Sequence, residues 1–317
     1  MTHQKVSVII PVYNAVDYIE RALNSAINQK EVGEVIIIND GSTDGTTEKL
    51  HHLRKTSLKI KIFKHEGNVN KGRSASRNLG IKKATCEFIA FLDADDFYLE
   101  NRFTNDIDIF SRITNCDGVY NAIGSYFYRK ASANELRYLS LVTINYHVDP
   151  ENLFHILLNG ENGHFSIDGL TLRKRIFDSI MPFREELVVA EDTELIWRLS
   201  LKCLLYPGIL EYPVAKRGVH NNNVFDDKNL YKPNILRMYE FLFFWSLKEN
   251  FKIEIVEQFL KRIWTWRLRG NYTIMSHFTY WISLIIKSLP SRFLYLHLKF
   301  SPFNRVALKL SILFKGK

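Results

Sequence analysis

Three aspartates close together in the sequence are the residues whose types and spacing most readily support chemistry. The apolar run Phe88–Leu92 predicts one buried strand, and Asp93, Asp95 and Asp96 follow it directly. Because unpaired carboxylates are costly to bury, something must neutralise them. Asp93 and Asp95 can turn toward one point, and a pair of hard oxygen ligands suits Mg²⁺ or Mn²⁺, which fill their remaining positions with water and substrate phosphates. The alternative is a solvated acidic loop that caps the next helix.

The elements that must position these aspartates alternate between strand and helix. Apolar, β-branched runs predict three earlier strands, and the segments between them show helical spacing or polar helical character. These three strands are expected at Val6–Ile10, Glu34–Ile38 and Lys59–Phe63. Such alternation predicts βαβ units and an α/β fold with a mostly parallel sheet.

Several of the polar residues follow the expected strands directly. In open parallel sheets the ligand site lies beyond the carboxyl ends of the strands. Three of those ends carry such residues: Pro11–Asn14, which includes Tyr13; Asp40; and Asp93–Asp96. One cleft is therefore expected to receive all of them. The first turn has no Gly-x-Gly-x-x-Gly, which argues against a dinucleotide-binding dehydrogenase. A metal is therefore expected to hold the phosphates in place of backbone amides.

Three other segments carry charged or titratable side chains, and each has a structural and a functional interpretation. Arg73 and Arg77 lie one turn apart and could supply positive charge toward the same anion, or form a solvated helix face. Glu191 and Asp192 begin a run with helical spacing; they could be an acidic helix start that the macrodipole favours, or supply a general base for an attacking hydroxyl. His220 stands alone, and a lone histidine is more often structural than a ligand.

The middle of the chain is less regular. A short helix is expected at one segment and a strand at the next, and two aromatic-rich segments could form a hairpin or edge strands. In chain order these are the hairpin segments Gly118–Arg129 and Leu136–Val142, the helix Leu153–Leu158 and the strand Phe165–Leu172.

The bulk composition is that of a globular protein, with 46% hydrophobic and 24% charged residues in 317. Cys86, Cys116 and Cys203 are scattered without the spacing of a zinc site or a disulfide framework, which fits a reducing cytosol. The N-terminus lacks the pattern of a signal peptide, and no segment reaches the ~18 uninterrupted apolar residues of a spanning helix.

Positive charge is concentrated at the C-terminal end. Lys228–Lys317 holds 16 Lys and Arg residues against four Glu, a net charge of +12, whereas the preceding part has a net charge of −3. We therefore expect two parts, a catalytic domain over residues 1–227 and a helical, basic and aromatic region over residues 228–317. That region is expected to dock on an anionic membrane surface, or alternatively to pack on the catalytic domain. Nucleic acid also binds basic aromatic surfaces, but no recognition motif supports it here.

Four motifs in order, SVIIPVYNA, INDGSTDGT, NKGRSASRN and FLDADD, resemble the family 2 glycosyltransferases, which have a GT-A fold. The resemblance covers about the first third of the chain closely. It implies that Pro11, Tyr13 and Asp40 contact the nucleoside, with Asp40 at the uracil edge, and that Arg77 lies near the nucleotide. It also implies that Asp93-x-Asp95 meets the ribose and the metal on the diphosphate.

The same resemblance favours the functional interpretation of the segments that contain Asp192 and His220. Glu-Asp-x-x-Leu-x-x-Arg is similar to the family's catalytic segment, which makes Asp192 the base and gives Glu191 a positioning role. Similar enzymes often carry a histidine near the place of His220 that closes over the diphosphate or touches the metal. Together with the cleft argument above, the expected nucleotide-sugar contacts are Pro11, Tyr13, Asn14, Asp40, Arg77, Asp93, Asp96 and Glu191, and the expected metal ligands are Asp93, Asp95 and His220.

The implied activity is metal-dependent, inverting transfer of a hexose from a UDP-sugar to a hydroxyl, with Mn²⁺ or Mg²⁺ as cofactor. The basic C-terminal region suggests a lipid-linked or oligosaccharide acceptor in bacterial surface-polysaccharide synthesis, at the inner face of the cytoplasmic membrane. A processive synthase would show several spanning helices and a Gln-x-x-Arg-Trp motif, and the sequence has neither. A nucleotidyltransferase would carry a glycine- and Arg/Lys-rich loop after the first strand. A non-catalytic scaffold that retains nucleotide binding is the remaining alternative.

Overall fold

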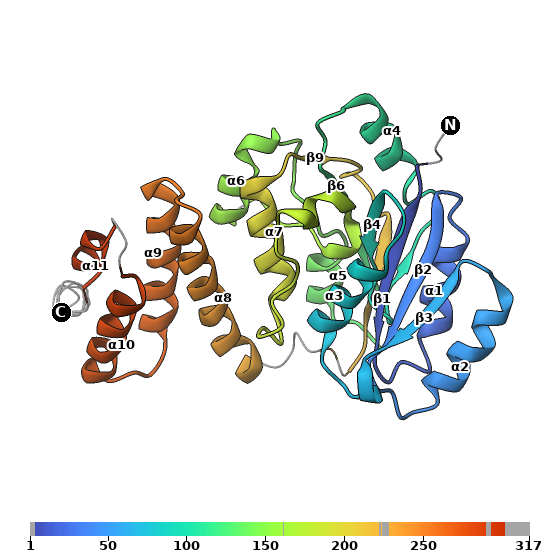
Figure 1. Cartoon of the computed structure of the whole chain (residues 1–317), viewed down its shortest axis with the longest axis horizontal. Helices are drawn as coiled ribbons and strands as arrows, with labels where there is room; N and C mark the ends of the chain where they lie inside the picture. Colours follow the sequence, from blue (N-terminus) through green and yellow to red (C-terminus); the bar gives the residue numbers. More distant parts are fainter. Residues whose placement is uncertain (1–3, 161, 222, 224–227, 290–292, 302–317) are drawn as a thin grey trace. The chain divides into compact units, whose positions relative to one another are not determined.

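The computed structural model describes residues 4–160, 162–221, 223, 228–289 and 293–301 (Figure 1). The chain divides into two compact units, Met1–Asp226 and Asp227–Lys317.

A seven-stranded sheet organises the first unit, and its strand order is β3-β2-β1-β4-β8-β6-β9. β3, β2, β1 and β4 run parallel, β8 is antiparallel to both β4 and β6, and β9 is parallel to β6. The bounds are β1 Val6–Val12, β2 Val32–Asn39, β3 Ile60–Lys64, β4 Phe88–Phe91, β6 Gly118–Tyr120, β8 Leu170–Arg173 and β9 Leu205–Pro207. The four strands expected from apolar runs are confirmed, as is the mostly parallel α/β sheet.

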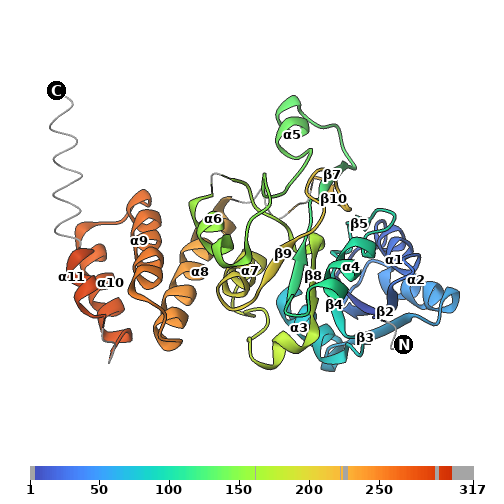
Figure 2. The same ribbon diagram turned by 90° about the horizontal axis from the view of Figure 1, so that it is seen from above.

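Helices cover both faces of this sheet (Figure 2). The face that carries Val8 and Ile10 packs on α1, whose buried side chains belong to the same apolar cluster. The opposite face packs on α3, and a Cβ added at Gly80 of α3 would lie 2.3 Å from Ile9 Cγ2. Glycine at that position therefore sets how closely α3 approaches β1. The helices of this unit are α1 Ile19–Ile27, α2 Thr46–Leu53, α3 Arg73–Lys83, α4 Thr104–Arg112, α5 Ala133–Tyr138, α6 Leu153–Asn159 and α7 Glu191–Lys202.

A second, three-stranded sheet lies beyond the end of β4. Its order is β5-β10-β7, with β5 Phe97–Tyr98, β10 Ala215–Val219 and β7 Gly124–Phe127. β5 follows the aspartates after β4, so pairing of β10 with β5 brings a segment some 120 residues later in the sequence next to them.

Two expectations for the middle of the chain need correction. The structure has helix α5 at Ala133–Tyr138 where a strand was expected from Leu136. Ser132 and Glu135 form a capping box there, which fixes the helix start more strongly than the apolar run favours a strand. The strand expected over Phe165–Leu172 begins only at Leu170, because a 3₁₀ turn occupies Ile167–Gly169. The short helix expected at Leu153–Leu158 is confirmed as α6.

The second unit is helical, as its sequence predicts. Its helices are α8 Lys228–Lys248, α9 Ile253–Arg269, α10 Ile274–Lys287 and α11 Tyr295–Lys299. α8 and α9 pack against each other, and Leu242, Phe259 and Trp264 are among their buried apolar residues. None of the described helices has both the length and the apolar character that crossing a membrane requires.

Candidate functional site

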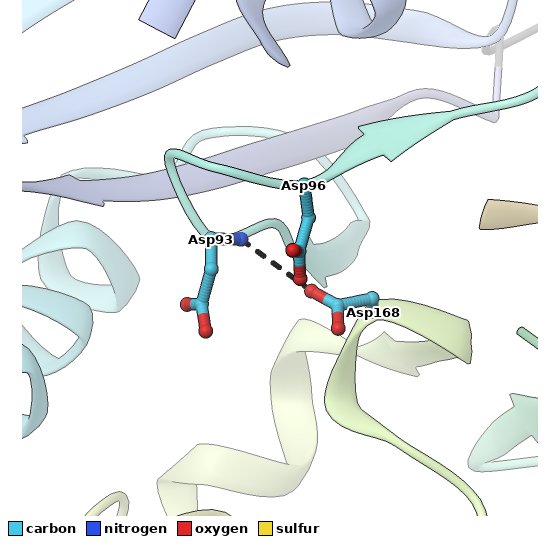
Figure 3. A group of neighbouring side chains, drawn as sticks. All are labelled: Asp93, Asp96 and Asp168. Atoms are coloured by element: carbon cyan, nitrogen blue, oxygen red, sulfur yellow. Dashed lines mark hydrogen bonds between the residues drawn. The ribbon is translucent and has the colours of Figure 1, made fainter. Parts of the chain in front are cut away.

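An acidic cluster of Asp93, Asp96 and Asp168 lies at the end of β4. Each residue offers one carboxylate oxygen, and these three oxygens lie within 4.8 Å of one another (Figure 3). Asp93 and Asp96 come from the loop after β4, whereas Asp168 comes from the 3₁₀ turn before β8. Because β8 runs antiparallel to β4, the end of β4 meets the start of β8, which is why Asp168 reaches this cluster.

Burial and mutual repulsion oppose ionisation of two members of the acidic cluster. Asp96 and Asp168 are buried, and burial raises the pKa of Asp96 well above its ordinary value, with further repulsion from Asp168 and Asp95. Burial likewise raises the pKa of Asp168, and the charge of Asp93 adds to the effect. Asp96 Oδ1 accepts a hydrogen bond from the backbone N–H of Gly218 at 2.7 Å. Close, buried carboxylates of this kind favour a bound cation, and three hard oxygen donors suit Mg²⁺ or Mn²⁺.

Arg77 is a buried cation that joins two elements of the site. Its guanidinium donates to Asp93 Oδ1 at 2.6 Å and to Glu191 Oε1 at 2.9 Å. Burial by itself raises the pKa of Asp93, but Arg77 and Arg73 lower it, and the net pKa is below the ordinary value. Arg77 therefore connects the end of β4 to the start of α7. Its predicted contact with the nucleotide stays a prediction.

Arg73 contacts the same loop from the first turn of α3. Its Nε lies 3.2 Å from Glu191 Oε1, and its guanidinium donates to the Val188 carbonyl at 3.3 Å. Burial raises the pKa of Glu191, as does Asp192, while Arg73 and Arg77 oppose the increase. Arg73 thus holds the segment before α7 and is not simply a solvated residue.

Asp192 lies in the first turn of α7, where the chain has an unusual backbone conformation. Asp192 Oδ1 accepts hydrogen bonds from the backbone N–H of Thr193 at 2.7 Å and from its hydroxyl at 3.3 Å, so the carboxylate is held in one orientation. Ala190, at the N-cap, has φ +64° and ψ 14°, a left-handed conformation that costs a non-glycine residue about 1 kcal/mol. Strained residues of this kind cluster at functional sites.

Asp40 is buried at the end of β2 and holds the start of α3. Its two carboxylate oxygens accept the backbone N–H groups of Lys71 at 2.7 Å and Gly72 at 2.9 Å. His65 Nε2 lies 3.5 Å from Asp40 Oδ1. Asp40 therefore organises the loop that leads to Arg73, and its recognition of uracil stays a prediction.

The loop after β1 lies beside the segment that follows Asp40. Asn14 has φ +47°, its Oδ1 accepts from Thr43 N at 2.8 Å, and its own N–H donates to Ser42 Oγ at 3.1 Å. Tyr13 is half exposed, whereas Pro11 is buried within β1 opposite Ile38. The structure therefore presents Tyr13 at this edge of the sheet, and Pro11 shapes the strand end.

Asp95 and His220 form a separate pair. His220 Nε2 lies 2.9 Å from Asp95 Oδ2, and the His220 ring stacks on Tyr18 with centroids 5.1 Å apart. The three expected metal ligands therefore fall into two groups, with Asp93 in the acidic cluster and Asp95 beside His220. Whether either group binds a metal stays a prediction.

Two residues of the site were not expected from the sequence. Asp168 interrupts the apolar run FSIDGL, and an acid within such a run is the signal that could have identified it. Arg217 of β10 donates to Ser166 Oγ at 3.0 Å, and the charges of Asp168 and Asp96 raise its pKa against the effect of burial. Only the tertiary fold reveals Arg217, because the residues it neutralises lie about 50 and 120 positions earlier.

Comparison with known proteins assigns the chain to a family. The family model described as glycosyl transferase family 2 matches residues 7–179, more than half of the chain. The chain belongs to this family.

Individual relatives and solved structures are similar over different shares of the chain. An uncharacterized glycosyltransferase of Haemophilus influenzae is 30% identical over 45% of this chain and 54% of its own length. The minor teichoic acid biosynthesis protein GgaA of Bacillus subtilis is 31% identical over 65% of this chain and 45% of its own length. The chain thus spans about half the length of these curated relatives. The crystal structure of S. aureus TarS 1–349 in complex with UDP-GlcNAc aligns with a TM-score of 0.62 at 20% identity, over 90% of this chain and 82% of that one. This likeness shows the GT-A fold.

Proposed function

We propose that this chain is an inverting glycosyltransferase that moves a sugar from a UDP-sugar to a hydroxyl group of a lipid-linked or oligosaccharide acceptor. The observation that carries the proposal is the meeting of the acidic cluster with Arg77, Glu191 and Asp192 at one edge of the sheet. A site of this kind offers oxygen ligands for a metal and a carboxylate base on neighbouring elements.

The donor and the pathway are proposed from the relatives. TarS has been solved with UDP and with UDP-GlcNAc, which supports a uridine diphosphate donor. The names of two Bacillus subtilis relatives refer to minor teichoic acid and teichuronic acid biosynthesis, which supports a role in bacterial surface polysaccharides. The proposed location is the cytoplasmic side of the membrane, where the C-terminal region would bind peripherally.

The nucleotide would be held by residues of the first unit. Asp40 is proposed to accept from the uracil edge with oxygen lone pairs beyond those used by Lys71 and Gly72, and Tyr13 and Asn14 to line the same end. Asp93 and its neighbours would hold Mn²⁺ or Mg²⁺, with Asp95 and His220 as the other candidate ligands. When bound, this cation would stabilise the negative charge of the departing diphosphate.

The transfer itself needs a base and a fixed geometry. Asp192 is proposed to take the proton of the acceptor hydroxyl as its oxygen attacks C1 of the donor sugar and the bond from C1 to the diphosphate breaks. Glu191 does not react. Its ion pairs with Arg77 and Arg73 fix the start of α7 and so the position of Asp192. One displacement inverts the anomeric centre, so an α-linked donor gives a β-linked product.

The test is hydrolysis of a panel of nucleotide sugars without acceptor, in Mn²⁺, Mg²⁺ or EDTA. Slow, metal-dependent release of UDP from one donor supports the proposal and identifies the sugar. Asp95→Ala and Asp168→Asn then distinguish the two candidate ligand groups, because only ligands of the metal are expected to change its apparent affinity. Asp108→Asn is the matched control, since Asp108 is an exposed residue of α4 paired with Arg112. If no donor is hydrolysed or bound with any metal, the proposal fails and a non-catalytic role follows.

A further inference from the structure

The outward side of α10 is apolar. Met275, Ile282 and Ile286 are 69%, 37% and 62% exposed, and Leu289, just beyond the helix, is 56% exposed. At ~100° per residue, the three helical positions fall within an arc of ~40°. These four apolar side chains form a strip, which we call the α10 strip, and the exposed Thr279 lies beside it.

The opposite side of α10 is more polar than the exposed side. His277, Leu284 and Ser288 are buried there. Ser288 Oγ lies 3.1 Å from His297 Nε2 of α11, and Trp281 Nε1 donates to the His297 carbonyl at 2.8 Å. A surface helix in water normally buries its aliphatic side chains and exposes its polar ones. α10 departs from this pattern, because two of its three buried side chains are polar while its outward side carries the α10 strip. This arrangement suits an outward side that meets an apolar medium.

α11 also exposes apolar side chains. Tyr295 and Leu298 are 55% and 65% exposed, and they lie three positions apart on one face of this helix. Exposed apolar patches on a protein surface mark interaction sites.

The charge of this region selects the partner. The segment 274–299 contains Lys287, Arg292 and Lys299 and no acidic residue, and the whole segment Lys228–Lys317 has a net charge of +12. A second copy of the chain would place equal positive charge against this surface. An anionic lipid headgroup layer is complementary to it, and each nearby Lys or Arg adds about 1 kcal/mol of attraction.

The length of α10 determines how it would meet a bilayer. Its 14 residues extend ~21 Å, short of the ~30 Å hydrocarbon core. It would therefore lie in the interface with the strip toward the acyl chains and Lys287 at headgroup level. We infer that the α10 strip, Met275, Ile282, Ile286 and Leu289, is the surface that binds the chain to an anionic bilayer. This inference rests on the proposed function in one respect: binding to the bilayer would bring the enzyme to a lipid-linked acceptor.

The test is co-sedimentation of the full chain with phosphatidylcholine vesicles, with and without phosphatidylglycerol. Wild type is expected to bind the anionic vesicles, and Ile282→Ser/Ile286→Ser to lower the partition coefficient at least tenfold. Leu58→Ser/Met181→Ser is the matched control, because both side chains are exposed residues of the first unit, and it is expected to bind like wild type. Lys287→Glu is expected to weaken binding roughly fivefold, with the difference lost in high salt.

Several outcomes would overturn the assignment. It falls if wild type does not bind anionic vesicles, or if the double serine variant binds as well as wild type while keeping wild-type helicity. It also falls if light scattering shows a dimer that the double serine variant converts to a monomer, because a second copy then covers the strip. Donor hydrolysis separates the two proposals. A chain that hydrolyses its donor but ignores vesicles refutes only this surface, and a chain that binds vesicles but hydrolyses no donor refutes only the proposed function.

Discussion

Arg77 and Arg73 provide a matched comparison of a buried and a partly exposed cation with the same partner. Both lie on α3 and both contact Glu191 Oε1, at 2.9 Å and 3.2 Å. The Arg77 side chain is 1% exposed and also contacts Asp93, whereas the Arg73 side chain is 34% exposed. Burial should therefore decide the cost of losing each one.

We predict that Arg77→Gln lowers the free energy of unfolding by about 3–5 kcal/mol, because it leaves two carboxylates without their buried counter-charge. Arg73→Gln should lower it by less than about 1 kcal/mol, since solvent screens a partly exposed pair. Urea unfolding monitored by circular dichroism measures both values. In a double-mutant cycle with Glu191→Gln, Arg77 should show a coupling energy of about 2 kcal/mol or more and Arg73 well under 1 kcal/mol.

Equal costs for the two arginine variants would refute this reasoning. So would a coupling between Arg77 and Glu191 below about 0.5 kcal/mol, because the ion pair would then not fix the start of α7.

Three further predictions concern the base, the helical unit and the sheet. Asp192→Asn should reduce transfer to acceptor at least ~10²-fold with UDP affinity unchanged, as measured by product formation and calorimetry, and a parallel loss of UDP binding would contradict the role of base. Burial lowers the pKa of His297 from 6.5 to about 4. The contribution of neutral His297 to the free energy of unfolding is therefore present above pH 6.5 and is lost as the pH falls toward 4. The loss should be on the order of 2 kcal/mol. Fluorescence-detected unfolding of wild type and His297→Gln can measure it, because four of the five tryptophans lie after residue 227. An identical pH dependence in the variant would exclude His297 as the source of the loss. Gly80→Ala should lower the free energy of unfolding by about 1–3 kcal/mol, because its Cβ would press on Ile9, and an unchanged midpoint in urea would show that α3 can move away from β1.

The parallel half of the sheet was predictable because its signals are local. Buried strands of a parallel sheet read as continuous apolar runs, and each of the four found this way is present. The polar residues at their ends, such as Asp40 and Asp93, could be grouped at one edge because parallel strands end at the same edge. The pairing of Arg77 with Glu191 could not be predicted in this way, because the two residues are 114 positions apart.

The antiparallel half was not predictable in the same way. Its strands are three or four residues long, and the contribution of Asp168 depends on β8 lying beside β4. Likewise, Arg217 and His220 reach the site only because β10 pairs with β5, a strand far from it in the sequence. Long-range strand pairing leaves no periodic pattern in a single sequence, whereas strand runs and helix spacing do.

Binding of UDP in the presence and absence of Mn²⁺, measured by calorimetry, tests the central claim most directly. Asp93 was expected from the sequence to be a metal ligand, and the structure places it in the acidic cluster, so its substitution tests that candidate metal site. We predict that wild type and Asp192→Asn bind UDP with Mn²⁺, and that EDTA or Asp93→Asn weakens binding at least tenfold. Binding of UDP that neither EDTA nor Asp93→Asn changes, or no binding at all, would contradict a metal-dependent nucleotide-sugar site at this edge of the sheet.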